Sequence, residues 1–278
     1  GTITVPAGVT EFTVTVPTTD DALVENTEAF TLTVGGATGT GTILDNDTAT
    51  ITHVGNADGD VAGVTVTEGT AAVFTVNLSN ASVNAETFSL SLASGTATLG
   101  DDFTAALTFS DGVVLNGDGT ITVPAGVTEF TVTVPTTEDA LVENTEGFTL
   151  SVGGVEATGT IVDGDSVSIS IADASATEGD DLVFTVDLGT PSASAAEYDF
   201  ALSDVTTEGA DYGSPSFSDD VTYDAVTGKI TVPANVASFT VTIPTAADSL
   251  VEGDETLTLT VGGVEATGTI VDGDSVSI

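Results

Sequence analysis

Carboxylate side chains recur at fixed spacings in this sequence, with Gly, Thr and Asn around them and almost no basic residue. In one pattern an Asp is followed four residues later by a Glu, as in DALVE, which occurs twice, and DSLVE. In another, two Asp residues separated by one residue end an apolar stretch, as in DND and two copies of DGD. Clustered carboxylate oxygens are the ligands that hard cations such as Ca²⁺ prefer, at about 2.3–2.6 Å and six to eight per ion.

The charge balance excludes several classes of function. The 278 residues contain 43 Asp and Glu against a single Lys or Arg and one His, which gives a formal net charge of −42. Nucleic acid and anionic membrane surfaces are unsuitable partners, because both are bound through basic side chains. Cys is absent, so soft-metal and thiolate chemistry are excluded. No apolar run reaches the ~20 residues of a membrane span, so we expect no membrane insertion.

Internal repetition predicts the domain organisation. The stretch GTITVPAGVTEFTVTVPTT at Gly1 returns unchanged at Gly119 and, in altered form, at Gly228. The acidic closures at Asp45, Asp163 and Asp272 keep the same offsets. We therefore predict the C-terminal half of a truncated repeat at 1–47, a complete repeat with an insert near 53–60 at 48–165, a complete repeat at 166–274, and the start of a further repeat at 275–278.

The apolar residues of each repeat alternate with polar ones. Phe130, Val132 and Val134, for example, alternate with Thr131 and Thr133. Alternation of this kind, interrupted by Gly, Pro and Asp, is typical of half-buried antiparallel strands. About seven short strands in each ~110-residue repeat predict an all-β protein of tandem immunoglobulin-like sandwiches, arranged as an elongated rod.

The carboxylates fall in the loops between these strands, at positions that converge on one pole of each sandwich. Without basic neighbours they would repel one another, and a bound divalent cation would remove that repulsion. The predicted calcium ligands are Asp21, Glu25, Asp45 and Asp47 in the first repeat, Glu68, Asp102, Asp139, Glu143, Asp163 and Asp165 in the second, and Glu178, Asp211, Asp248, Glu252, Asp272 and Asp274 in the third.

These motifs resemble the Calx-β family, found in sodium/calcium exchanger regulatory domains and in bacterial surface proteins. The shared elements are TEG, then GDDF or GADY, then DALVENTE or DSLVEGDE, and finally Asp-x-Asp. The resemblance implies a seven-stranded immunoglobulin-like sandwich that binds Ca²⁺ at the end from which the next domain departs. Asn46 and Gly164 stand where a fuller acidic triplet has its middle Asp. The acidic, Lys-poor tandem style further resembles the extender regions of repeats-in-toxin (RTX) adhesins.

Two weaker signals lie in the insert. His53 has no Cys or second His to form a catalytic pair, so it indicates no active site. Asn56, Asp58 and Asp60 alternate like the start of a calcium loop, but the Gly expected next is Val61, so a polar turn competes with an extra cation site. The absence of Trp and of an aromatic cleft argues against a glycoside hydrolase and, more broadly, against an enzyme.

The sequence therefore predicts structural spacer repeats of a bacterial cell-surface adhesin, stiffened by Ca²⁺ at the junctions and serving attachment or biofilm formation. The expected partners are the neighbouring repeats, with the adhesion ligand bound by domains outside this sequence. Two alternatives remain: a calcium-sensing regulatory module, and a subunit of an extracellular fibre or surface layer in which another chain completes the first repeat. We expect an extracellular location on the bacterial cell surface.

Overall fold

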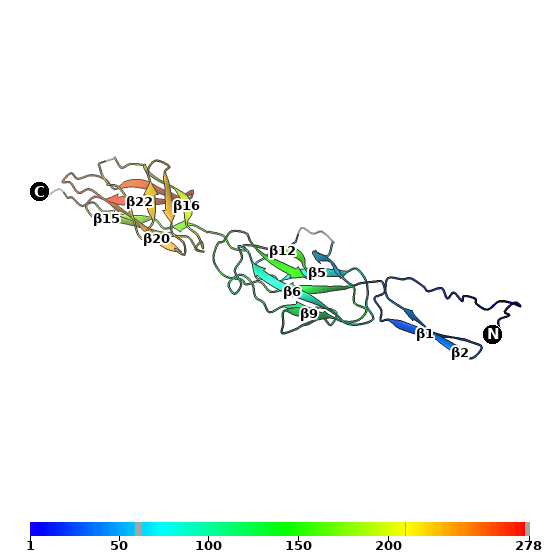
Figure 1. Cartoon of the computed structure of the whole chain (residues 1–278). Helices are drawn as coiled ribbons and strands as arrows, with labels where there is room; N and C mark the ends of the chain where they lie inside the picture. The colour runs from blue at the N-terminus through cyan, green and yellow to red at the C-terminus, as the bar shows by residue number, and fades with distance from the viewer. Residues whose placement is uncertain (59–62, 209, 276–278) are drawn as a thin grey trace.

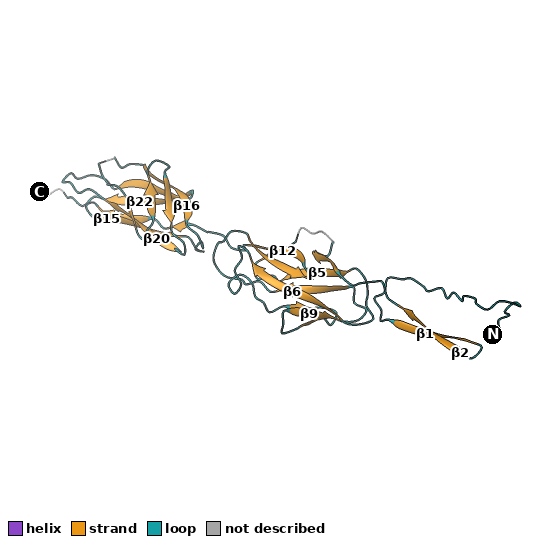
Figure 2. Ribbon diagram, viewed as in Figure 1, coloured by secondary structure: helices purple, strands orange, loops and turns teal. Residues whose placement is uncertain are grey.

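The computed structural model describes residues 1–58, 63–208 and 210–275, and it shows β structure following the chain in a row of three parts (Figure 1). The described residues form strands and loops, and none forms a helix that could cross a membrane (Figure 2). The predicted all-β class is confirmed. Asp60 of the possible calcium loop lies outside the described residues, so the extra cation site remains a hypothesis.

The middle sandwich consists of two sheets that enclose one apolar core. The strand order is β3-β5-β10-β7 in one sheet and β4-β12-β11-β6-β9-β8 in the other. Its strands are β3 (Ile51–Gly55), β4 (Val64–Thr67), β5 (Ala72–Leu78), β6 (Glu86–Ser94), β7 (Thr108–Phe109), β8 (Val114–Leu115), β9 (Thr120–Val123), β10 (Glu129–Val134), β11 (Glu146–Val152) and β12 (Val155–Val162).

The C-terminal sandwich repeats this topology around a core of its own. The two orders are β13-β15-β20-β17 and β14-β22-β21-β16-β19-β18. Its strands are β13 (Ser170–Ile171), β14 (Ala174–Thr177), β15 (Asp181–Asp187), β16 (Ala196–Asp204), β17 (Ser216–Phe217), β18 (Thr222–Asp224), β19 (Lys229–Val232), β20 (Ser238–Pro244), β21 (Glu255–Val261) and β22 (Val264–Val271).

The pairing is antiparallel except at one edge of the larger sheet, where β4 runs parallel to β12 and β14 runs parallel to β22. The chain enters each sandwich in the smaller sheet, as β3 or β13, and then crosses to the edge of the larger one. This crossing explains the parallel pair and divides the first strand into two. Together with two-residue pieces such as β7 and β8, it raises the number of described strands in each sandwich above the expected seven.

Alternation places the apolar residues inside, as the sequence pattern predicts. Phe130, Val132 and Val134 on β10 are at most 1% exposed, whereas the intervening Thr131 and Thr133 lie at intermediate depth. Phe148 on β11 packs at the centre of the middle core, stacked on Phe103 with ring centroids 4.6 Å apart. Burial of this two-layer core is the main force that closes the sandwich.

The N-terminal segment, residues 1–47, forms a single hairpin of β1 (Glu28–Val34) and β2 (Ala37–Ile43). Residues 1–19 repeat the sequence of 119–137, yet they form no strand, whereas the later copy forms β9 and β10. The later copy pairs with β5 and β6, and the described part of the N-terminal segment contains no counterparts of these strands. Phe12 and Val14 are consequently 47% and 48% exposed, so pairing partners rather than propensity decide strand formation here.

Gly159→Ala tests the packing of the middle core. A Cβ at Gly159 on β12 would overlap the ring of Phe148, which Phe103 and Phe74 hold from other sides. We expect a loss of about 1–3 kcal/mol in the free energy of unfolding, measured by urea denaturation. Gly117→Ala is the matched control, because a Cβ there meets no atom within 4 Å. Equal stability of the two variants would contradict this packing.

Candidate metal centre

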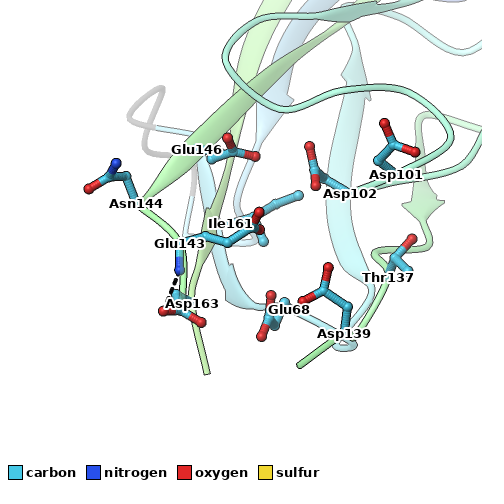
Figure 3. Close-up of a pocket in the computed structure, with 10 residues that line it drawn as sticks. All are labelled: Glu68, Asp101, Asp102, Thr137, Asp139, Glu143, Asn144, Glu146, Ile161 and Asp163. Atoms are coloured by element: carbon cyan, nitrogen blue, oxygen red, sulfur yellow. Dashed lines mark hydrogen bonds between the residues drawn. The ribbon is translucent and has the colours of Figure 1, made fainter. Parts of the chain in front are cut away.

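Loops from four separate parts of the middle sandwich bring their carboxylates to one pole. Glu68 follows β4, Asp102 lies between β6 and β7, Asp139 and Glu143 connect β10 to β11, and Asp163 follows β12. These side chains point into a common hollow (Figure 3). The residues that line the hollow are Glu68, Asp101, Asp102, Thr137, Asp139, Glu143, Asn144, Glu146, Ile161 and Asp163.

The carboxylate oxygens are close enough together to bind the same metal ion. Three groups have one oxygen from each member within 4.8 Å of the others. Two oxygens on opposite sides of one Ca²⁺, each about 2.4 Å from it, would be separated by about 4.8 Å, so each group fits the coordination sphere of a single ion. The groups are Glu68 with Asp163 and Asp165, Glu68 with Asp139 and Glu143, and Asp102 with Glu143 and Glu146.

Backbone amides hold these carboxylates in place. Asp163 accepts hydrogen bonds from Glu143 N–H at 2.9 Å and from Asp165 N–H at 2.8 Å, one on each oxygen. Asp139 accepts one from Leu141 N–H at 2.7 Å. Asp163 thereby ties the loop between β10 and β11 to the segment that leads into the next sandwich.

Glu68 is the most deeply placed of these acids, with 7% of its surface exposed. Its Oε1 accepts a hydrogen bond from Gly164 N–H at 3.2 Å. Burial raises the pKa of Glu68, and the nearby charges of Asp163, Glu138 and Asp139 raise it further, while the Gly164 bond acts in the opposite direction. A buried acid surrounded by acids is costly unless a proton or a cation compensates it.

One oxygen of Asp165 and its counterpart in Asp274 have no hydrogen-bond partner within the described part of the chain. Both are Oδ2 atoms, and both are buried. The backbone amides of the same two residues do have partners, since Asp165 N–H donates to Asp163 and Asp274 N–H donates to Asp272. A buried acceptor without a donor costs free energy, which a ligand able to reach it would recover.

Glu146 lies beside Asp102 in the pole of the middle sandwich. Burial raises the pKa of Glu146 to about 7, with further contributions from a hydrogen bond to Asp102 and from the charges of Asp102 and Glu143. The pKa of Glu143 is also raised, chiefly by burial and then by Asp139, Asp102 and Asp163. A proton shared near neutral pH is therefore one way in which the ion-free pole reduces its repulsion.

The C-terminal sandwich reproduces this arrangement at its own distal pole. In two groups, one oxygen from each member lies within 4.8 Å of the others. The groups are Glu178 with Asp248 and Glu252, and Glu178 with Asp272 and Asp274. Asp272 accepts hydrogen bonds from Glu252 N–H at 2.9 Å and Asp274 N–H at 2.8 Å, as Asp163 does in the middle sandwich.

Asp211 belongs to neither of these groups. It accepts a hydrogen bond from Glu208 N–H and lies beside Glu255. Burial raises the pKa of Glu255 to about 6, and the hydrogen bond to Asp211 adds to this shift. Asp211 and Glu255 therefore occupy the places of Asp102 and Glu146.

The N-terminal segment has the same hydrogen bonds between backbone amides and Asp carboxylates, but fewer acidic residues. Asp45 accepts hydrogen bonds from Glu25 N–H at 2.8 Å and Asp47 N–H at 3.1 Å, and Asp21 accepts one from Leu23 N–H at 2.9 Å. These four predicted ligands line one pocket, but among the described residues they form no group of three oxygens as close as those above. This segment lacks counterparts of Glu68 and Asp102.

The predicted ligands did not include Glu146 or Glu255. Glu146 begins β11 and is a member of one carboxylate group, and Glu255 begins β21 and lies beside Asp211. Both are the last residue of the motifs DALVENTE and DSLVEGDE, which also provide Glu143 and Glu252. The repeated Glu three residues after the first one was the signal that could have identified them.

The few basic groups lie away from these poles. Lys229 is on β19 and forms an ion pair with Glu197 on β16 at 3.7 Å. His53 lies on β3, where its ring contacts the carbonyl of Asn56 at 3.2 Å. The acidic poles therefore have no side-chain countercharge within the described residues.

Fold and site together define a protein of tandem immunoglobulin-like sandwiches, each with a carboxylate cluster at its distal pole. The Calx-beta domain model matches residues 1–58, 45–175 and 213–274, which together cover most of the chain. The chain belongs to the Calx-beta domain family.

Solved structures with similar folds include CBD12 from CALX1.2, at 17% identity over 72% of this chain and 77% of that one, with a TM-score of 0.31. Domains 4 and 5 of the S-layer protein SbsC match at 16% identity over 64% and 82%, with a TM-score of 0.27. The C-terminal domain of Streptococcus pyogenes AspA matches at 11% over 81% and 98%, also with 0.27. At these values the likenesses carry no functional argument. Among curated proteins, no relative matches.

The pKa of Glu146 gives the ion-free protein a defined pH dependence. Its folded value of about 7 lies above the ordinary 4.5, so the stability it contributes is fully present at low pH and is lost as pH rises through 7. Because Glu146 is only partly buried, we expect solvent screening to limit the loss between about pH 5 and pH 8 to about 1 kcal/mol. Thermal melts in chelator would measure it.

Glu146→Gln is the variant for this pH experiment, and Glu156→Gln, at an exposed position of β12, is its control. The first substitution should flatten the pH dependence of the melting temperature, whereas the second should leave it unchanged. A wild-type protein that becomes more stable over this range would show that Glu146 is not the controlling group.

Proposed function

We propose that this chain is a set of structural spacer repeats whose sandwiches are stiffened by Ca²⁺ bound at their distal poles. The observation that carries the proposal is the set of carboxylate groups: three in the middle sandwich and two in the C-terminal one, each compact enough for one ion. Calcium-binding structural repeats are a role consistent with membership of the Calx-beta family.

The donor set favours calcium over other metals. The groups contain only carboxylate oxygens, from both Asp and Glu, and they come from loops rather than from one rigid element. Ca²⁺ accepts such flexible, oxygen-rich sites, while Mg²⁺ requires near-octahedral geometry and retains most of its water. The absence of Cys removes the thiolates that soft metals prefer.

The proposed role of the bound Ca²⁺ is to hold together the loops that carry these carboxylates at the distal end of each sandwich. Glu68 belongs to two of the groups, and Asp163 links the loop of Glu143 to the segment that enters the next sandwich. When an ion neutralises these acids, their mutual repulsion disappears, and the linker is held at the pole. Without the ion, repulsion favours looser loops and freer joints.

A spacer role fits the other features of the chain better than catalysis does. The two sandwiches have the same strand order, and both carry acidic groups at the distal pole. Repeated like-charged units also resist lateral aggregation. We infer that the chain extends a binding head from a bacterial surface, as in RTX adhesin extenders, and that it works outside the cell.

Calcium removal is the direct test of this proposal. With Ca²⁺ at 100 times its Kd we expect about 2.7 kcal/mol of stabilisation per site, or roughly 10–20 °C in melting temperature for a sandwich of this size. Calorimetric titration and thermal melts, in Ca²⁺ and in chelator, would measure both affinity and effect. Kd values of about 10⁻⁴–10⁻³ M would support a spacer, whereas micromolar values with a local shape change would favour a calcium sensor.

Asp165→Asn should act with opposite signs in the two conditions. Without Ca²⁺ it removes a negative charge from a buried oxygen that has no hydrogen-bond partner in the described structure, so the melting temperature should stay the same or rise. With Ca²⁺ it removes a ligand, so much of the calcium-induced rise of the middle sandwich should be lost. Glu156→Gln removes the same charge outside the pole and should behave as wild type in both buffers. An undiminished calcium response in Asp165→Asn would contradict the site.

A further inference from the structure

The loop that carries Asp139 and Glu143 also contacts the next sandwich. Val142 N–H donates to the carbonyl of Pro191 at 2.9 Å, and Ala193 N–H donates to the carbonyl of Val142 at 3.0 Å. Val142 and Ser192 thus form a parallel β-bridge between two sandwiches. The Ser192 hydroxyl adds a bond to the Val142 carbonyl at 3.1 Å. Three hydrogen bonds therefore converge on one residue of the acidic loop.

The joint between the N-terminal segment and the middle sandwich has the same arrangement. Val24 N–H donates to the carbonyl of Ala81 at 2.9 Å, and Val83 N–H donates to the carbonyl of Val24 at 2.9 Å. Val24 and Ser82 form the corresponding parallel bridge. The residues on either side of the Ser differ between the joints, so the shared element is the backbone pairing.

The Ser of each bridge is also fixed to its own sandwich. The carbonyl of Ser82 accepts Gly126 N–H at 2.9 Å, and that of Ser192 accepts Asn235 N–H at 2.8 Å. Gly126 and Asn235 lie in the turns before β10 and β20, and both have positive φ, 78° and 63°. Each Ser thus connects the acidic loop of the preceding part to a turn of its own sandwich.

The C-terminal sandwich shows the same loop without a bridge among the described residues. Leu250 and Val251, the counterparts of Leu141 and Val142, are 62% and 53% exposed, whereas Leu141 and Val142 lie at intermediate depth. The two apolar side chains of this loop are therefore less exposed at the bridged joint.

We propose that these two bridges are clamps that set the angle between successive parts of the chain, and that the acidic pole acts on the joint through Val142 and Val24. Asp139 and Glu143 flank Val142, and their hydrogen bonds with Leu141 N–H and with Asp163 fix the backbone on both sides of it. The clamp itself stands independently of any ion, while its response to calcium rests on the proposed function. In each joint the Val pairs with a segment of the next sandwich that offers a carbonyl and, two residues later, an amide.

The test places the substitution on the partner side, so that the acidic loop keeps its sequence. Ala193→Pro removes the amide that donates to Val142. Ala195→Pro is the matched control, because in the described structure the amide of Ala195 donates to no acceptor. Since the chain has no Cys, spin labels at Glu156→Cys and Glu265→Cys would report the distance between the two sandwiches.

Pulsed electron spin resonance would give the distance distribution in Ca²⁺ and in chelator, with calcium binding counted in parallel. In Ca²⁺ we expect one narrow distance for the wild type and for Ala195→Pro. We expect loss of that narrow distance in Ala193→Pro, with an unchanged number of bound ions. Ser192→Ala keeps the backbone bridge and removes the two bonds of the hydroxyl, to the Val142 carbonyl and from the Ser194 amide. It should broaden the distribution to a smaller extent, and it covers the case in which the proline variant misfolds.

The outcomes separate the clamp from the proposed calcium function. A distribution in Ala193→Pro and Ser192→Ala as narrow as in the wild type would overturn the clamp, whatever the number of ions. A wild type that binds no Ca²⁺ would overturn the proposed function, and the clamp would then be judged in chelator alone, by the difference between Ala193→Pro and Ala195→Pro.

Discussion

Like charges held together without countercharge are the constraint on which the rest of this structure depends. Each distal pole gathers acids that no Lys, Arg or His approaches in the described residues, since Lys229 pairs with Glu197 elsewhere. A fold would normally separate such groups, because their repulsion grows as they leave water. Here Glu68 is nearly buried among them. The apolar cores must therefore supply the free energy that holds the poles together when no cation does.

The hydrogen bonds show how the poles are prepared for a ligand. Asp163, Asp272 and Asp45 each accept two backbone amides, one of them from the loop that carries a predicted Glu ligand. This fixes the backbone while the other carboxylates keep oxygens free toward the hollow. Because hydrogen bonds from main-chain amides to these Asp carboxylates already form the frame, little ordering entropy remains to be lost when a cation binds.

The sequence was sufficient to predict strands and acidic loops, which follow from local residue patterns. It was not sufficient to predict features that depend on a pairing strand or on a neighbouring domain. Alternation predicted β10 and β11, and the spacing of acidic motifs predicted which loops meet at the pole. Residues 1–19 show the limit, since the same letters form strands only where β5 and β6 are present to pair. The bridge between Val142 and Ser192 could not be predicted from the sequence either. Its backbone hydrogen bonds can form with many different residue types, so they leave no sequence pattern.

That independence from side chains explains how one joint can recur while its surroundings change. The first joint adds hydrogen bonds from Asn80 to Asp47 at 3.3 Å and from Asn84 to Asn26 at 3.0 Å. The second has Thr190 and Ser194 in place of the two donors, and the described residues there show no equivalent bonds. Backbone pairing fixes the common geometry of both joints. The side chains around it are then free to vary from one joint to the next.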